Sequence, residues 1–248
     1  RSFSDSDGDG VGDLPGILSQ LDYVQSLGVD AVWISPFYRS PMKDFGYDVS
    51  DFCAVDPLFG TLQDFRDVLA ACKERGLRVL VDQVWNHTSD QHPWFEESRS
   101  SRNNPRADWY VWVDAAEDGG PPNNWRSTFG GSAWAWCPQR EQYYLHNFLV
   151  EQPDLNWYKE EVVDAVLATA RFWLELGVDG FRLDVINFLR HDRRLRDNPA
   201  RAPDQPRPAG AGAEDPFFDQ INLHNLCQPE TVDLRPRIRA LMDEYGAT

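Results

Sequence analysis

The chain is poor in cysteine, in methionine and in basic side chains. Its 248 residues include four cysteines and two methionines, and 24 lysines and arginines stand against 40 aspartates and glutamates. The cysteines at positions 53, 72, 137 and 227 show no C-x-x-C spacing and do not cluster with histidine, which argues against a zinc site and a disulfide framework. Free thiols in a reducing, cytoplasmic compartment are therefore expected.

Long apolar runs are also absent. No segment approaches the ~18 consecutive apolar residues of a membrane span, and no secretory signal is visible. The formal net charge of −16 opposes binding to nucleic acid or to an anionic membrane surface. With 42% hydrophobic and 13% aromatic residues, the chain can still build a sizeable core. These features indicate a globular protein that binds a neutral or cationic ligand.

Three segments share one pattern, an amphipathic helix that ends at a glycine and is followed by a short apolar strand. The helices are predicted over residues 14–28, 61–76 and 158–177, and the strands over 31–34, 79–81 and 180–185. The strand at 31–34 is predicted to be buried. Leu14, Ile17 and Leu21 show the helical spacing of the first, and Thr61 can cap the second. Parallel strands joined by helices require a doubly wound sheet or a barrel.

Two intervals interrupt this pattern. Residues 88–150 are rich in tryptophan and tyrosine among glycines and prolines, which predicts a small irregular subdomain with its own packing. Residues 196–216 are rich in proline and alanine and are predicted to form a surface loop. A last helix is expected over residues 234–245.

The segment Gly180-Phe181-Arg182-Leu183-Asp184-Val185 is the strongest chemical signal. In a strand, residues i and i+2 point to the same face, so Arg182 and Asp184 are expected to lie together. A neighbouring guanidinium favours the ionised carboxylate. A charged pair at the C-terminal end of a buried strand is typical of barrel active sites. An ordinary internal ion pair is the alternative.

Polar residues also follow the other two strands. Asp82 and His87 follow the strand at 79–81, although a lone histidine is more often structural than functional. Asp44, Tyr47 and Asp48 follow the strand at 31–34. A tyrosine ring can stack on a sugar while carboxylates bind its hydroxyls. A plain turn permitted by Gly46 is the competing interpretation.

Near the N-terminus, Asp5-Ser6-Asp7-Gly8-Asp9-Gly10-Val11-Gly12-Asp13 alternates carboxylates with small residues. This spacing lets a tight loop place oxygen ligands around a hard cation. The twelfth position counted from Asp5 is Gly16 rather than glutamate, which argues against a true EF-hand. We predict a structural Ca²⁺ or Mg²⁺ loop, with a solvated acidic turn as the alternative.

These segments, together with Gln152-Pro153-Asp154-Leu155-Asn156, resemble the retaining α-glycosidases of the α-amylase family. The resemblance is strongest to the oligo-1,6-glucosidase and α-glucosidase branch. It implies an α/β fold, a (β/α)8 TIM barrel of which this chain holds about four βα units, with an irregular subdomain inserted after the third strand. The implied domains are residues 1–87 for the first part of the barrel, 88–150 for the inserted subdomain, and 151–248 for the continuation up to the fifth strand.

The resemblance also implies site residues. Asp184 stands where the family has its catalytic nucleophile, with Arg182 as its partner. Substrate binding is implied for Asp44, Tyr47, Asp82, His87, Phe129 and Gln152, and metal binding for Asp5, Asp7, Asp9, Asp13 and the Val11 carbonyl. Val185 resembles members that accept α-1,6 bonds. The implied reaction is retaining hydrolysis of terminal α-1,6 or α-1,4 glucosidic bonds in short oligosaccharides, through a covalent glucosyl-enzyme and without an organic cofactor.

In the family the acid/base glutamate lies on the strand after Thr248. The resemblance therefore implies that the C-terminal half of the barrel is missing here as a partner, and that residues 1–248 alone are inactive. Two alternatives stay open: a sugar isomerase or transglucosidase that shares the same first half, and a non-catalytic homologue that acts as a binding subunit.

Overall fold

The computed structural model describes residues 2–212 and 214–248 and forms two compact units. The first unit contains the chain up to Val84 together with Ala165–Asp184 and Pro236–Thr248. The second contains Trp85–Asp164 and Val185–Arg235. The units thus group residues 185–235 with the inserted segment, a grouping that the sequence pattern does not indicate. The boundaries at 87 and 150 stay a prediction.

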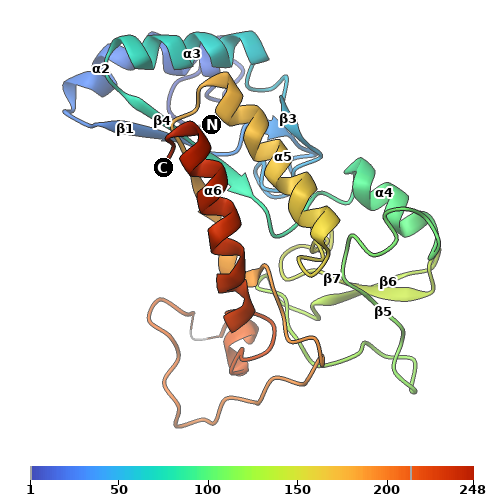
Figure 1. Ribbon diagram of the computed structural model, residues 1–248. Coiled ribbons are helices and arrows are strands. Elements are labelled where there is room, and N and C mark those ends of the chain that lie inside the picture. Colours follow the sequence, from blue (N-terminus) through green and yellow to red (C-terminus); the bar gives the residue numbers. More distant parts are fainter. Residues whose placement is uncertain (1, 213) are drawn as a thin grey trace. The chain divides into compact units, whose positions relative to one another are not determined.

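A parallel sheet of three strands lies at the centre of the first unit (Figure 1). Its order is β1 (Ala31–Ile34), β4 (Arg78–Val84) and β8 (Gly180–Asp184). The register pairs Ile34 with Val81, Asp82 with Arg182, and Val84 with Asp184. All three predicted strands are confirmed, and their C-terminal ends lie at the same edge of the sheet.

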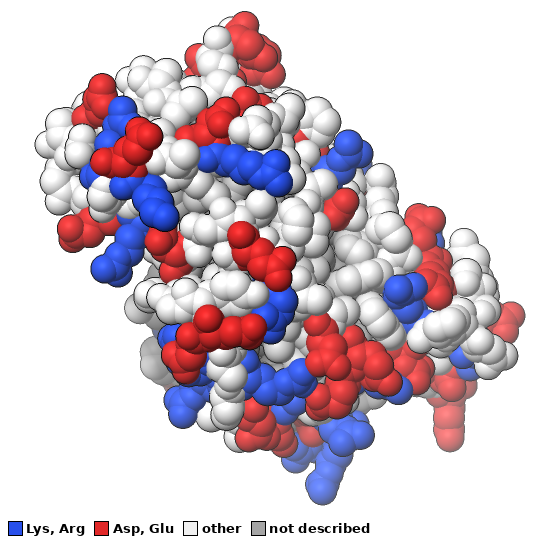
Figure 2. All heavy atoms as spheres, turned by 45° about the horizontal axis from the view of Figure 1, so that its top comes forward, with Lys and Arg blue, Asp and Glu red and all other residues white. Residues whose placement is uncertain are grey.

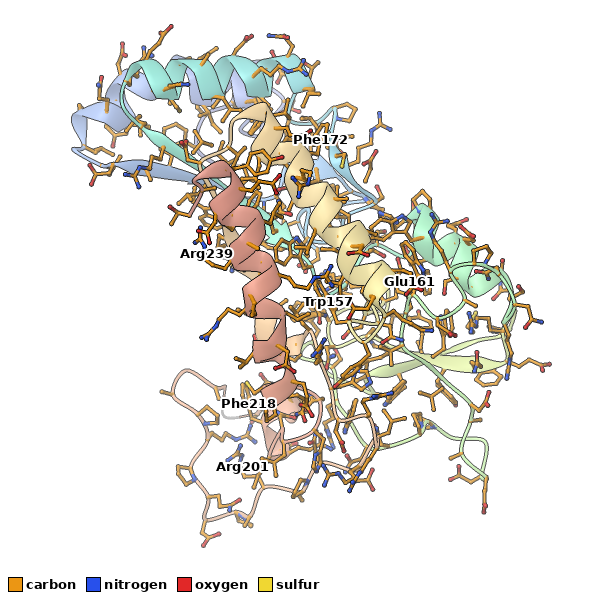
Figure 3. All side chains as sticks on the ribbon, in the orientation of Figure 1. Trp157, Glu161, Phe172, Arg201, Phe218 and Arg239 are labelled. Carbon is orange, nitrogen blue, oxygen red and sulfur yellow. The ribbon has the colours of Figure 1, made fainter. Side chains whose placement is uncertain are left out.

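Helices and a small ribbon complete this unit. They are α1 (Leu14–Ser19), α2 (Leu21–Ser26), α3 (Leu62–Glu74), the antiparallel pair β2 (Tyr38–Arg39) and β3 (Asp51–Val55), and most of α5 (Glu160–Leu176) and α6 (Arg235–Tyr245). Helices α5 and α6 lie side by side (Figure 1), and Arg171 of α5 forms an ion pair with Glu244 of α6 at 2.6 Å. In Figure 3, Phe172 and Arg239 mark these two helices.

The start of α3 matches the sequence prediction. The Thr61 hydroxyl accepts the backbone N–H of Asp64, and the Asp64 carboxylate accepts the backbone N–H of Thr61 at 2.7 Å. This reciprocal capping box satisfies donors that the first turn of a helix leaves free. At the other end, Gly76 has a φ of 71°, a left-handed conformation that favours glycine after a helix.

Two expectations for the first unit are wrong. The helix predicted over residues 14–28 is divided at Gln20, whose φ and ψ of −112° and 10° are not helical. The Ser19 hydroxyl donates to the Gly16 carbonyl there, and such local bonds compete with the helix. In addition, β1 is not fully buried, because Trp33 is 49% exposed. Among the described strands β1 lies at the edge of the sheet, which leaves part of its surface uncovered.

The core of the first unit is aromatic. The buried indole of Trp173 packs within 5.3 Å of the rings of Phe37, Tyr38 and Phe65, measured between centroids. Its N–H donates to the Phe52 carbonyl at 2.7 Å. This hydrogen bond offsets the cost of removing the indole N–H from water, so the burial of Trp173 leaves no donor unpaired.

The second unit has its own sheet and core, as predicted for the irregular insertion. Its elements are α4 (Pro93–Ser100), β5 (Trp112–Val113), β6 (Trp134–Cys137), β7 (Gln142–Leu145) and the 3-10 helices η1 (Ile186–Phe188), η2 (Pro216–Asp219) and η3 (Pro229–Leu234). The strands form an antiparallel sheet in the order β5-β7-β6. Trp125 and Trp134 stack with centroids 5.8 Å apart in the core beside Leu145.

The predicted surface loop at 196–216 lies in this unit. Its described residues before Pro216 form no helix or strand, apart from one bridge at Ala200. Arg201 donates to the Phe218 carbonyl at 2.8 Å, and both residues are labelled in Figure 3.

The four cysteines are free. None of the helices in the described residues combines the length and the apolar character that a membrane crossing needs. Acidic side chains lie beside basic ones across the face shown in Figure 2.

Candidate active site

Arg182 links two buried carboxylates at the C-terminal ends of β4 and β8. Its Nη1 lies 2.7 Å from Asp82 Oδ2 and 2.7 Å from Asp184 Oδ1. The register places Asp82 directly opposite Arg182, and Asp184 lies two residues further on the same strand. The two carboxylates therefore share one guanidinium, which is more than the ion pair that the sequence suggested.

Asp82 is fully buried and held by aromatic hydroxyls. Tyr47 Oη donates to Asp82 Oδ2 at 3.3 Å, and Tyr38 Oη donates to the Asp82 backbone carbonyl at 2.5 Å. The other carboxylate oxygen, Asp82 Oδ1, is buried and has no hydrogen-bond partner in the described part of the chain. An unpaired buried acceptor is costly and requires an explanation in a native structure.

Burial sets the ionisation of this group. It raises the pKa of Asp82 to about 6, although the Arg182 guanidinium acts in the opposite direction. The pKa of Asp184 is also raised, first by burial, while Arg182 lowers it and the charge of Asp44 raises it. Arg182 favours the ionised form of Asp184, as the sequence indicated, but removal of the carboxylate from water outweighs the shared cation.

Asp48, which the sequence indicated as a carboxylate that could bind a sugar hydroxyl, shapes the turn that carries Asp44 and Tyr47. Its fully buried carboxylate accepts the backbone N–H groups of Lys43 and Asp44, both at 2.9 Å. The turn needs this support because Phe45 and Gly46 have φ values of 50° and 98°. A Cβ at Gly46 would lie 3.0 Å from the Pro36 carbonyl oxygen, so the site tolerates only glycine without strain.

The sequence did not indicate Trp33 as a residue near the site. Its ring lies 5.3 Å from the Arg182 guanidinium carbon, at a distance typical of cation–π contacts. The sequence indicated only an apolar strand residue, because its contact with Arg182 depends on the order of strands in the sheet.

His87 and Gln152 meet in the second unit. Gln152 Nε2 lies 3.1 Å from His87 Nε2, and Gln152 Oε1 accepts the backbone N–H of Leu149 at 2.9 Å. Both side chains are buried. The Phe148 ring packs on His87 with centroids 5.0 Å apart, and Phe129 packs on Phe148 at 6.1 Å. Phe129 is 59% exposed, so it can offer an aromatic surface.

Asp154 is a second buried carboxylate in this unit. Its oxygens accept the backbone N–H and the side-chain amide of Asn147 at 3.0 and 2.5 Å. Burial nevertheless raises its pKa to about 7. The sequence indicated this residue only as part of a signature, without a structural role.

We expect Asp154 to make the stability of the protein depend on pH. Its folded pKa of about 7 lies above its usual value of 3.8, so between these values the folded chain binds the extra proton. The free energy of unfolding should therefore fall as the pH rises from about 4 to about 7, by up to ~1.4 kcal/mol per pH unit from this group. Urea unfolding across this range measures the slope, and Asp154→Asn should reduce it. An unchanged slope in Asp154→Asn would contradict the prediction, and the exposed Asp204→Asn is the control.

The acidic loop brings three of its carboxylates together. Oxygen atoms of Asp5, Asp7 and Asp13 lie within 4.8 Å of one another, and Asp9 is outside this group. Asp9 Oδ1 instead accepts the backbone N–H of Val11 at 2.7 Å. Backbone donors lower the pKa of Asp5, first Gly10 and then Gly8, so this carboxylate is ionised at neutral pH. An oxygen-only set of ligands suits a hard cation such as Ca²⁺ or Mg²⁺.

Comparison with known proteins identifies the family. The family model described as "Alpha amylase, catalytic domain" matches residues 1–247. The chain belongs to the α-amylase family. Within this family it is 58% identical over its whole length to a probable α-glucosidase of Rhizobium meliloti, and 50% identical over 79% of its length to an oligo-1,6-glucosidase of Bacillus cereus. The crystal structure of the α-glucosyl transfer enzyme XgtA matches 99% of the chain with 60% identity and a TM-score of 0.97.

These α-amylase family relatives are longer than the chain. The chain covers 45% of the Rhizobium protein, 35% of the Bacillus protein and 46% of the transfer enzyme. The matched part is the N-terminal portion of a (β/α)8 barrel, which confirms the predicted fold class.

Proposed function

We propose that this chain carries the nucleophile of a retaining α-glucosidase, and that Asp184 is that nucleophile. The observation that carries the proposal is the placement of Asp184 and Asp82 around one Arg182 nitrogen, at the C-terminal ends of neighbouring parallel strands. Active sites of α/β barrels lie at this end of the strands. Membership of the α-amylase family and the α-glucosidase relatives support it.

The chemistry requires two carboxyl groups about 5 to 5.5 Å apart in a retaining enzyme. An oxygen of Asp184 attacks the anomeric carbon, and the bond to the leaving oxygen breaks as that oxygen receives a proton from the acid. A water molecule, deprotonated by the same group, then releases the glucose with its original anomeric configuration. We propose that the acid/base glutamate lies outside these 248 residues, and that the chain alone does not hydrolyse a glucoside.

The remaining predicted residues receive binding roles in this proposal. Tyr47 stacks on the non-reducing glucose, and the carboxylates of Asp44 and Asp82 accept hydrogen bonds from its hydroxyl groups. The buried Asp82 Oδ1 without a partner supports this role, because a sugar hydroxyl would satisfy it. In the second unit, His87 and Gln152 bind hydroxyls and Phe129 provides an aromatic wall. Val185, with a φ of 40°, follows the nucleophile and favours α-1,6 bonds.

A transglucosidase is the second candidate. It is favoured by the 60% identity to an α-glucosyl transfer enzyme, whereas hydrolysis is favoured by the α-glucosidase relatives. Both reactions share the covalent glucosyl intermediate and differ in whether water or a sugar takes the glucosyl group.

Proton NMR of the complete protein acting on isomaltose, maltose and sucrose tests the proposal. α-Glucose should appear first, before mutarotation, because the mechanism retains configuration. Longer oligosaccharides that exceed free glucose would instead support transfer, and β-glucose as the first product would exclude the retaining mechanism. Turnover of p-nitrophenyl α-glucoside by residues 1–248 alone would overturn the proposal that the chain alone is inactive.

We further propose that Asp5, Asp7 and Asp13 hold a structural Ca²⁺ or Mg²⁺, with Asp9 and the Val11 carbonyl as the remaining predicted ligands. The converging carboxylates support this site. A bound cation would neutralise charge in the loop and tie it to the start of α1, where Asp13 caps the helix by accepting the Gly16 N–H at 2.6 Å. No catalytic step depends on it.

Addition of Ca²⁺ to metal-free protein is expected to raise the Tm, because a cation that binds only the folded state stabilises it by mass action. Mg²⁺ should have a smaller or equal effect. Differential scanning calorimetry measures the shift, and Asp7→Asn should reduce it while Asp22→Asn, an exposed carboxylate outside the loop, should not. Equal shifts in all three proteins would mean general screening and would rule out the site.

A reducing, cytoplasmic compartment is also proposed. The free cysteines support it, since burial raises the pKa of the Cys53 thiol to about 11 and that of the Cys72 thiol above its usual value. Such thiols are poor nucleophiles and stay reduced easily.

A further inference from the structure

A polar cavity in the second unit has no role in the proposed glucosidase chemistry. Its volume is about 420 Å³, within the ~300 to 1,000 Å³ usual for small-molecule sites. Polar and charged side chains of the lining include Tyr158, His191 and Arg193. Its apolar side chains include Val111, Val113 and Leu195. All of these residues belong to the same compact unit, so the cavity is defined within it.

His191 provides the first sign of a ligand. It is only 9% exposed, and no hydrogen bond to its ring nitrogens is found among the described residues. Its ring is held by edge contacts to Trp125 and Tyr158, with centroids 5.8 and 5.5 Å away. Burial lowers its pKa to about 4, so the imidazole is neutral at pH 7 and presents one N–H donor and one acceptor.

Arg193 provides the second sign of a ligand. Its guanidinium carbon lies 5.1 Å from the centre of the Tyr158 ring, and no carboxylate forms an ion pair with it in the part of the chain that the structure describes. The other cation in the lining, Lys159, is already paired with Asp108 at 3.0 Å. Arg193 therefore has donors to offer to an anion.

Hydrogen bonds and ring contacts hold the residues around His191 and Arg193 in place. The Tyr158 hydroxyl donates to the His191 carbonyl at 2.5 Å, and Arg190 packs on the same ring at 5.1 Å. Leu195 adopts a φ of 54°, which is uncommon for a branched side chain, and its backbone is held by bonds to Asp192 and Asn123. Strained residues that the surrounding structure enforces often lie at binding sites.

We propose that this cavity binds a small organic anion, a phosphate monoester or a carboxylate. Arg193 and the His191 N–H bind its charged oxygens, and the wall formed by Val113 and Leu195 packs on its body. A hexose that carries one anionic group matches the volume and the polarity. The site is independent of the glucosyl transfer chemistry, so it can fail without affecting that proposal.

Isothermal titration calorimetry of the purified protein tests the site with three hexoses of similar size. We expect glucose 6-phosphate or glucuronate to bind at least tenfold more tightly than glucose. Arg193→Gln should weaken that binding at least tenfold, and His191→Phe, which keeps the ring contacts, at least fivefold. Arg194→Gln is the matched control, because it removes the same charge from an exposed neighbour outside the lining, and it should change the affinity less than twofold.

The difference between wild type and Arg193→Gln separates this cavity from any hexose bound elsewhere. Tight binding of only the phosphate or only the carboxylate supports the site and identifies its anionic group. Equal affinity for glucose, equal losses in Arg193→Gln and Arg194→Gln, or no measurable binding of either anion would each overturn the proposal. Circular dichroism of each variant verifies that it is folded.

Discussion

Replacing Asp184 by asparagine in the complete protein is expected to lower kcat by about 10⁴ or more, since the loss of a covalent nucleophile removes the intermediate on which both half-reactions depend. An amide oxygen is a far weaker nucleophile than a carboxylate, and it does not attract Arg182 as a charge. Because Asn has nearly the same volume, the strand and its packing should persist. Steady-state hydrolysis of p-nitrophenyl α-glucoside measures the loss.

Two controls separate chemistry from structure. Asp179→Asn changes the same residue type just before β8, at the opposite end of the strand, where its carboxylate accepts the Val79 backbone N–H at 2.8 Å, and it should leave kcat within about twofold of wild type. Asp184→Ala should be rescued in part by azide, with β-glucosyl azide as the product, because azide attacks from the face that the carboxylate has vacated. Activity of Asp184→Asn near that of wild type would overturn the assignment.

The sequence predicted the elements whose signals are local. The apolar runs at 31–34, 79–81 and 180–185 became the three parallel strands, and Thr61 became the cap of α3. The division of the first helix at Gln20 was not predicted, because the spacing of Leu14, Ile17 and Leu21 continues across it. Apolar periodicity reports which face packs, and it does not report a local backbone break.

Part of the site was also predictable, since residues at the C-terminal ends of adjacent parallel strands must converge. What could not be predicted was how the charges are shared. The pairing of Arg182 with Asp82 depends on the order β1-β4-β8, and the role of Asp48 depends on a turn with left-handed residues at Met42 and Phe45. Neither strand order nor such dihedral angles leave a periodic pattern in the sequence. The burial that raises the pKa values of Asp82 and Asp184 could not be predicted from the sequence either.

Replacing Arg182 by glutamine in the complete protein is expected to impair both activity and stability. The fully buried Asp82 would lose its cation, and because the Arg182 side chain is 44% exposed, the cost should lie below the roughly 3 to 5 kcal/mol of breaking a fully buried ion pair. The cost should be largest above pH 6, because the folded pKa of Asp82 is already raised to about 6 and its ionised form is the one that burial disfavours. Near pH 4 the carboxylate is protonated in the folded state of both proteins, so the difference from wild type should shrink. Urea unfolding at pH 4 and pH 8 measures this contrast.

The same substitution should move the pH dependence of catalysis. Arg182 lowers the pKa of Asp184, so its removal raises that pKa further, and the acidic limb of the kcat/KM profile should shift to higher pH. Arg182→Lys should shift it less, because an ammonium keeps the charge without the fork of donors. Arg78→Gln, at the exposed start of β4, should leave both the profile and the stability unchanged. A shift to lower pH in Arg182→Gln would mean that another group limits the reaction, and that Arg182 acts on the geometry of the two carboxylates and not on their charge.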